Sequence, residues 1–100
     1  MSSLDKNKYI CKNMDNAYRK VDDEIVIMDS ENSIIHRLQQ ESALDAWELT
    51  NGERNFNQII VEMKNKYGNP ENIISDFEEF FSELIKKKIL FLSDVPIKET

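Results

Sequence analysis

His36 is the only histidine of the chain and the first residue to test for chemistry. Histidine often serves as a general base or a metal ligand near neutral pH. A histidine-rich metal site or a proton relay needs a second histidine, which this sequence lacks. His36 also lies within a short apolar stretch, residues 34–38 (IIHRL). We therefore expect a packing or binding role for His36 rather than a catalytic one.

The other groups that could act as nucleophiles or acids also lack partners. Cys11 is the only cysteine, so it forms neither an internal disulfide nor a multi-cysteine metal site. Its polar N-terminal segment offers no local group to activate the thiol. Neighbouring carboxylates such as Glu78 and Glu79 fall at helix-surface positions, where a solvated face is expected. With no Gly-x-Ser-x-Gly motif and no glycine-rich phosphate loop, the sequence predicts a non-enzymatic protein without cofactor or metal.

Composition and charge limit the classes of binding partner that we expect. The chain has 13 basic and 19 acidic residues, for a net charge of −6, which disfavours nucleic acid and anionic membranes as partners. The one dense basic cluster, Lys86 to Lys88, is expected at a helix C-terminus, where the helix dipole favours cations. No charged-then-apolar leader and no apolar run of 18 residues is present. Together with the single cysteine, these features predict a cytoplasmic protein.

The length of 100 residues and a hydrophobic content of 40% suit one domain with a modest core. We expect that domain to span residues 14–95, with flexible ends at residues 1–13 and 96–100. Its first part predicts strands at residues 17–21 (AYRKV) and 24–28 (EIVIM), which flank the turn signal Asp22-Asp23. A third strand is predicted at residues 34–38, after a second turn signal. These three strands form an antiparallel meander.

Three helices are predicted after the strands. Ser42 and Asp45 resemble a capping box before a short helix that ends at Asn51-Gly52. Asn55 with Gln58 is a second start signal, and Gly68 ends that helix. Asn69-Pro70 is a third start signal.

The third helix has an unusually wide apolar face, because seven side chains fall within an arc of about 140° at helical spacing. They are Ile73, Ile74, Phe77, Phe80, Phe81, Leu84 and Ile85. Phe77, Phe81 and Leu84 lie mid-arc and are predicted to point into the core. One flank, either Ile73 with Phe80 or Ile74 with Ile85, must face the third strand. The sequence does not say which, and we favour Ile73 with Phe80, because a bulky ring would give a ligand a deep apolar contact.

The order of these segments resembles the PqqD family of peptide-modification chaperones, also called RiPP recognition elements. The resemblance covers about residues 17–92. It rests on a hairpin, a third strand ending "HRL", and helices containing "AWELTNG", "RNFNQIIVEM" and "ISDFEEFFSELIKKKIL". One departure is Lys88, which stands where such proteins often carry a glycine before the final apolar pair. The resemblance does not identify the pathway or the peptide.

The resemblance implies an α+β fold: a winged helix-turn-helix with a three-stranded antiparallel sheet followed by three helices. It also implies a binding protein that recognises the leader segment of a ribosomally made precursor peptide and presents it to a modifying enzyme, such as a radical SAM protein. The leader would add as a strand to the edge of the third strand. An unliganded edge strand can pair with a second copy, so we expect a monomer or an edge-strand dimer. The expected peptide-binding residues are Ile34, Ile35, His36, Arg37, Leu38, Ile73, Asp76, Phe77 and Phe80.

Two other functions remain open from the sequence. A winged-helix regulator that binds DNA has the same architecture and would need exposed basic or amide side chains at the start of its recognition helix. The stretch RNFNQ is a tolerable match to that need, and NPENIISD is a poor one. The net charge of −6 favours peptide binding over DNA binding. The third alternative is a small enzyme subunit or a structural adaptor without peptide specificity.

Overall fold

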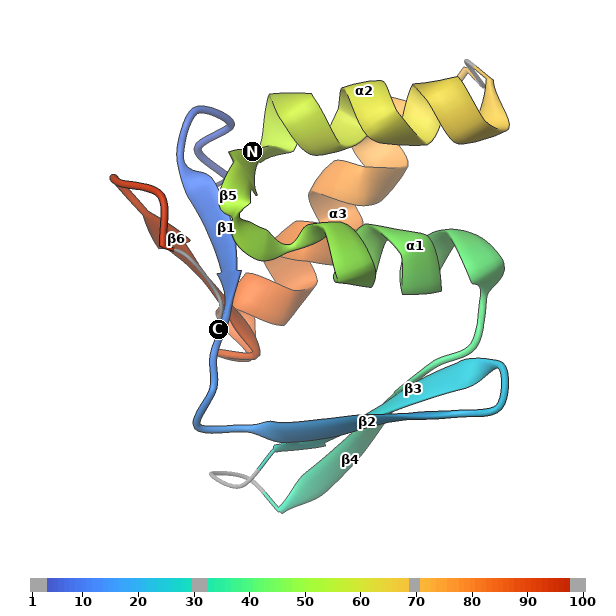
Figure 1. Cartoon of the computed structure of the whole chain (residues 1–100), viewed down its shortest axis with the longest axis vertical. Helices are drawn as coiled ribbons and strands as arrows, with labels where there is room; N and C mark the ends of the chain where they lie inside the picture. Colours follow the sequence, from blue (N-terminus) through green and yellow to red (C-terminus); the bar gives the residue numbers. More distant parts are fainter. Residues whose placement is uncertain (1–3, 30–32, 69–70, 98–100) are drawn as a thin grey trace.

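The computed structural model describes residues 4–29, 33–68 and 71–97. Helices and strands follow one another in these residues in an order that Figure 1 traces by colour. The elements are β1 (Tyr9–Lys12), β2 (Ala17–Val21), β3 (Glu24–Asp29), β4 (Ile34–Leu38), α1 (Glu41–Leu49), β5 (Asn51–Asn55), α2 (Phe56–Tyr67), α3 (Ile73–Lys86) and β6 (Leu90–Ser93). The fold is therefore mixed α+β, with three helices and antiparallel sheets in the described residues.

The first sheet is the predicted meander, in the order β2-β3-β4. Its hairpin turns at Asp22, which has a positive φ of 54°. Side chains alternate between the two faces of the sheet. Ile25 and Ile27 of β3 are buried, and they pair with Leu38 and His36 of β4. The prediction of three antiparallel strands over these residues is confirmed.

A second sheet was not predicted. It has the order β5-β1-β6 and joins segments far apart in the sequence. β1 lies within residues 1–13, which we expected to be a flexible arm, yet Ile10 is fully buried and Cys11 is 3% exposed. The expectation of a single sheet is thus wrong, and residues 9–12 of the expected arm form a strand of the second sheet. The physical reason is tertiary, because β1 obtains its hydrogen-bond partners from strands about 40 and 80 residues further along the chain.

The boundaries of the first two helices match the prediction in part. Asn55 and Gln58 form the expected capping box at the start of α2, and Gly68, with φ of 82°, ends it. The capping box predicted at Ser42 and Asp45 is wrong, because α1 begins after Gln40 without a side-chain cap.

The third helix begins at Ile73, after Asn72. The predicted start signal Asn69-Pro70 lies outside the described residues. The helix ends at Lys86, so the basic cluster Lys86 to Lys88 lies at its C-terminus as predicted. Lys88 adopts a left-handed φ of 62°, and the chain turns there into β6.

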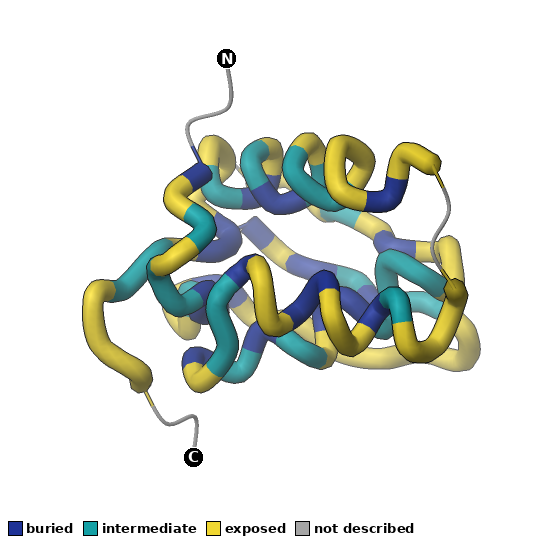
Figure 2. Tube along the Cα trace, turned by 90° about the horizontal axis from the view of Figure 1, so that it is seen from above, coloured by how far each residue is buried: buried dark blue, intermediate teal, exposed yellow. Residues whose placement is uncertain are grey.

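The core lies between the helices and the two sheets. In Figure 2 the buried segments face the interior of the molecule and the exposed ones its outer surface. Trp47 of α1, Phe56 of α2 and Phe81 of α3 are among its largest fully buried side chains. The rings of Phe56 and Phe81 meet edge to face, with centroids 6.1 Å apart. This packing fixes α3 against the rest of the protein and so positions its outer face.

Candidate functional site: a groove between β4 and α3

β4 is an edge strand. It pairs with β3 on one side, and none of the described residues pairs with its other side. Two large apolar side chains near its start are exposed, Ile34 by 50% and Ile35 by 59%. Proteins usually protect an edge strand with charges, proline or a covering segment, because its free N–H and C=O groups can recruit another strand. β4 therefore offers both hydrogen-bonding groups and apolar surface to a partner.

The helix α3 forms the second wall of a groove along this edge. The groove has a volume of about 580 Å³. Its strand wall consists of Ile35, His36, Arg37 and Leu38, and its helix wall of Asp76, Glu79, Phe80, Glu83, Leu84 and Lys87. The helix residues recur every three or four positions, which places them on one face of α3. Phe80 and Leu84 make the apolar part of that face.

Charges around the groove are mostly negative on the helix side. Lys87 lies 3.6 Å from Glu83 and Arg37 lies 3.8 Å from Glu24, measured between nitrogen and oxygen. Asp76 and Glu79 line the groove and form no ion pair with another described residue, so their negative charge is available to a ligand there. Such a wall favours lysine or arginine on a ligand over phosphate groups.

His36 lies on the inner side of this strand wall. Its Nε2 atom is buried and makes no hydrogen bond with another described residue, and it lies 3.7 Å from Oδ2 of Asp29. A hydrogen-bond partner would stabilise such a buried ring nitrogen, so this position agrees with the predicted packing or binding role of His36.

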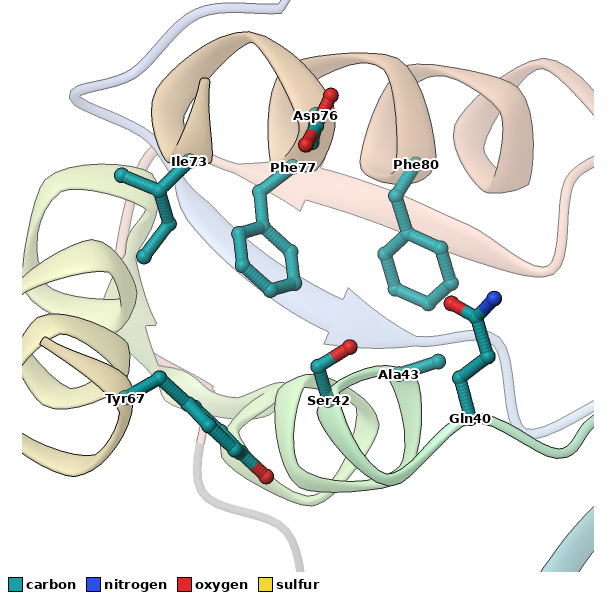
Figure 3. A pocket seen from close by; sticks show the side chains of 8 residues that line it. All are labelled: Gln40, Ser42, Ala43, Tyr67, Ile73, Asp76, Phe77 and Phe80. Carbon is teal, nitrogen blue, oxygen red and sulfur yellow. The ribbon is translucent and has the colours of Figure 1, made fainter. Parts of the chain in front are cut away.

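A cavity adjoins the groove beyond the end of β4. It has a volume of about 490 Å³ and lies between α1, the end of α2 and the first half of α3. Figure 3 shows the side chains that line it: Gln40, Ser42, Ala43, Tyr67, Ile73, Asp76, Phe77 and Phe80. Asp76 and Phe80 line both the cavity and the groove, so the two spaces adjoin at these side chains.

A polar cluster ties the rim of the cavity together. Tyr67 of α2 donates a hydrogen bond to the carboxylate of Asp45 in α1, and Lys66 Nζ lies 2.7 Å from the same carboxylate. The hydrogen bond from Lys66 has the largest effect on Asp45 and lowers its pKa below the ordinary value, and the hydrogen bond from Tyr67 lowers it further. The same carboxylate raises the pKa of Lys66 and of Tyr67. The cluster links α1 to α2 beside the cavity.

The structure brings most of the predicted peptide-binding residues together, in two neighbouring spaces. Asp76, Phe80 and residues 35–38 line the groove. Ile73 and Phe77 line the cavity instead, and Ile73 is only 5% exposed. Ile34 lines neither space and is exposed at the start of β4.

Several lining residues were not predicted. Leu84 was assigned to the core alone. It is buried, with 6% of its surface exposed, but it also lines the groove. Glu79 was assigned to a solvated helix surface and Glu83 was not considered, although their spacing from Asp76 along one helix face is the signal that could have placed both. Gln40, Ser42 and Ala43 depend on how α1 packs against α3, for which the sequence has no signal.

No group of three or more histidine, cysteine, aspartate or glutamate side chains gathers in residues 4–29, 33–68 and 71–97 in a way that could hold a metal ion. No helix within these same ranges is both long and apolar enough to cross a membrane.

Comparison with known proteins gives one finding. A family model described as coenzyme PQQ synthesis protein D (PqqD) matches residues 24–90. The chain belongs to the PqqD family. The matched region runs from the start of β3 to the first residue of β6 and includes both walls of the groove. Membership in the PqqD family supports an accessory role in the biosynthesis of coenzyme PQQ or a similar modified peptide. No curated protein and no solved structure matches the chain.

Proposed function

We propose that this PqqD-family protein binds the leader segment of a ribosomally made precursor peptide and presents the rest of the peptide to a modifying enzyme, such as a radical SAM protein. The leader adds to β4 as a fourth strand of the first sheet. The observation that carries this proposal is the free edge of β4 beside a groove whose other wall is α3. Backbone hydrogen bonds supply affinity in strand addition, and pockets for alternate side chains supply specificity.

The side chains around the groove suggest the composition of the leader. Every second residue of an added strand faces the groove. Phe80 and Leu84 favour apolar residues at these positions. Asp76 and Glu79 favour lysine or arginine nearby. The same carboxylates repel nucleic acid, so the groove supports peptide binding rather than the DNA-binding alternative.

The protein acts in this proposal without catalysis of its own, as an accessory binding protein. The meander serves as the wing of a winged helix-turn-helix, and α3 serves as the helix that faces the ligand. Without leader, the free edge of β4 can pair with the same edge of a second copy. The leader and the second copy then compete, so the monomer is expected to dominate when leader is bound.

Titration of the protein with a fluorescently labelled leader tests this function. The peptides to test are the leader segments of any short precursor peptides encoded next to the gene for this protein, and a generic DNA duplex is the comparison ligand. We expect saturable binding of the leader and none of the duplex. A folded protein that binds the duplex and not the leader would contradict the proposal.

Proline substitutions test the strand addition directly. Ile35→Pro removes a backbone donor or distorts β4, so we expect the affinity for leader to fall by about tenfold or more, equal to about 1.4 kcal/mol. Arg19→Pro is the matched control, because it places proline on β2, at the opposite edge of the same sheet. It should leave the affinity unchanged. Unaltered leader binding by a folded Ile35→Pro variant would exclude β4 as the binding edge.

A further inference from the structure

We propose that the cavity between α1 and α3 is a separate subsite, which binds one large apolar side chain of the leader from the segment just before the added strand. This inference rests on the proposed function and extends it beyond the sheet edge. Strand addition alone explains the groove but gives no use to the adjoining cavity of about 490 Å³. The contacts of the cavity assign it to the same ligand.

The position of the cavity determines which part of the leader reaches it. β4 ends at Leu38, and Gln40, two residues further on, already lines the cavity. All pairings within this sheet are antiparallel. A leader strand that continues the pattern runs opposite to β4, so its N-terminal flank passes Gln40. Asp76 and Phe80 line both spaces, so a flank that leaves the groove at these residues reaches the cavity next to it.

The lining defines the chemical class of the side chain. Ala43, Ile73, Phe77 and Phe80 give the cavity apolar walls, and in Figure 3 the rings of Phe77 and Phe80 point toward α1 across the open space. These two rings lie edge to face, with centroids 6.3 Å apart, which leaves ring surface available for a third apolar group.

The polar groups at the mouth of the cavity add a requirement. The side chains of Gln40, Ser42 and Asp76 make no hydrogen bond with another residue in the described parts of the chain. Asp76 can only accept hydrogen bonds when ionised. The side chain that fits best is therefore apolar along its length and carries a donor at its end. Tyrosine and tryptophan meet both requirements.

Filling the cavity from the protein side is the first test. Ser42 of α1 faces the cavity in Figure 3, so Ser42→Leu occupies the space without touching β4. The matched control is Ser75→Leu, because Ser75 is exposed on α3 and lines neither the groove nor the cavity. We expect Ser42→Leu to weaken leader binding by about tenfold and Ser75→Leu to leave it unchanged. Thermal unfolding of both variants reports whether they are folded.

Shortening the leader is the second test and needs only the unaltered protein. A leader that lacks the segment before the strand should bind about tenfold more weakly than the complete leader. It should also bind equally well to the unaltered protein and to Ser42→Leu. Equal affinity of the complete and shortened leaders overturns the subsite, and so does a folded Ser42→Leu variant with full affinity. In both cases the proposed function survives if Ile35→Pro still weakens leader binding by about tenfold or more. A protein that binds no leader at all contradicts the proposed function itself.

Discussion

Phe80 and Phe81 are consecutive residues of α3, and their ring centroids lie only 5.2 Å apart, yet the two side chains belong to different parts of the protein. Phe81 is fully buried and packs against Phe56. Phe80 is partly exposed and lines both the groove and the cavity. A helix turns by about 100° per residue, so neighbouring positions can separate stability from ligand binding.

This separation predicts opposite effects of truncating the two rings. Phe81→Ala should lower the free energy of unfolding by about 3–5 kcal/mol, because it leaves a cavity in the core. Phe80→Ala should lower it much less and should instead weaken the binding of leader. Urea unfolding and leader titration on both variants provide the measurement. If Phe80→Ala unfolds the protein or leaves the affinity unchanged, this flank of α3 does not bind the leader.

The elements that the sequence predicted well are those with local signals. Residues 17–21, 24–28 and 34–38 are rich in β-branched or aromatic side chains and are separated by turn residues, and the structure has strands at these places. The start of α2 was also predicted, since Asn55 and Gln58 satisfy each other's backbone groups within four residues. Such signals need no knowledge of the tertiary fold.

The second sheet had no comparable signal. β5 has the sequence NGERN, which is polar and contains a turn dipeptide, so it was predicted as the end of a helix and the start of the next. It becomes a strand because β1 supplies hydrogen-bond partners from a distant part of the sequence. The cavity was missed for the same reason, because it arises from the packing of α1 against α3. The second sheet and the cavity thus depend on contacts between residues distant in the sequence, which no local pattern predicts.

Lys88 is the clearest local conflict between sequence and structure. Its φ of 62° is left-handed, a conformation that costs a non-glycine residue about 1–2 kcal/mol. The fold imposes it, because the next residue, Ile89, donates a backbone hydrogen bond to Leu84 and is buried. The carbonyl of Lys88 also accepts hydrogen bonds from the side chains of Asn13 and Asn16.

Replacing Lys88 by glycine should therefore stabilise the protein. We expect Lys88→Gly to raise the free energy of unfolding by about 1 kcal/mol, since the relieved strain exceeds the added entropy of the unfolded chain. Lys87→Gly is the matched control. Lys87 has an ordinary φ of −83°, so glycine there gains nothing and should destabilise. Chemical unfolding of the two variants decides the matter, and a Lys88→Gly variant no more stable than the unaltered protein would show that the turn carries no strain.

Gly52 and Gly68 permit a similar comparison for the C-terminal segment. Both have a positive φ, 83° and 82°. A Cβ atom on Gly52 would lie 2.0 Å from the carbonyl oxygen of Ile97, whereas one on Gly68 would meet nothing within 4 Å. The backbone N–H of Ile97 also donates to the carbonyl of Gly52, over 2.8 Å, so the segment after β6 lies against β5.

The two alanine variants should consequently differ in stability. Gly68→Ala introduces only backbone strain and should cost about 1–3 kcal/mol, because φ of 82° with ψ of −157° is a conformation almost confined to glycine. Gly52→Ala also places alanine at a positive φ and adds a backbone clash with Ile97, so its loss of unfolding free energy should be clearly larger. Equal losses in urea unfolding would mean that the contact between Ile97 and β5 contributes nothing to the fold.

The cluster of Asp45, Lys66 and Tyr67 predicts how stability depends on pH. The folded pKa of Asp45 is lowered from its ordinary value of 3.8, so its contribution is present above that value and is lost as the pH falls through the folded pKa. The pKa values of Tyr67 and Lys66 are raised from 10.0 and 10.5. Their contributions to stability are therefore present below these ordinary pKa values and are lost as the pH rises through the pKa values of the folded protein.

Asp45→Asn should remove both the acid and the alkaline effect. Its midpoint of thermal unfolding should fall below that of the unaltered protein near neutral pH, and the two midpoints should converge in strong acid and in strong base. Glu62→Gln is the control, since Glu62 is exposed on α2 and has no ion pair with another described residue, and it should leave the profile unchanged. A constant difference between Asp45→Asn and the unaltered protein at every pH would show that the side chain matters through packing rather than through its charge.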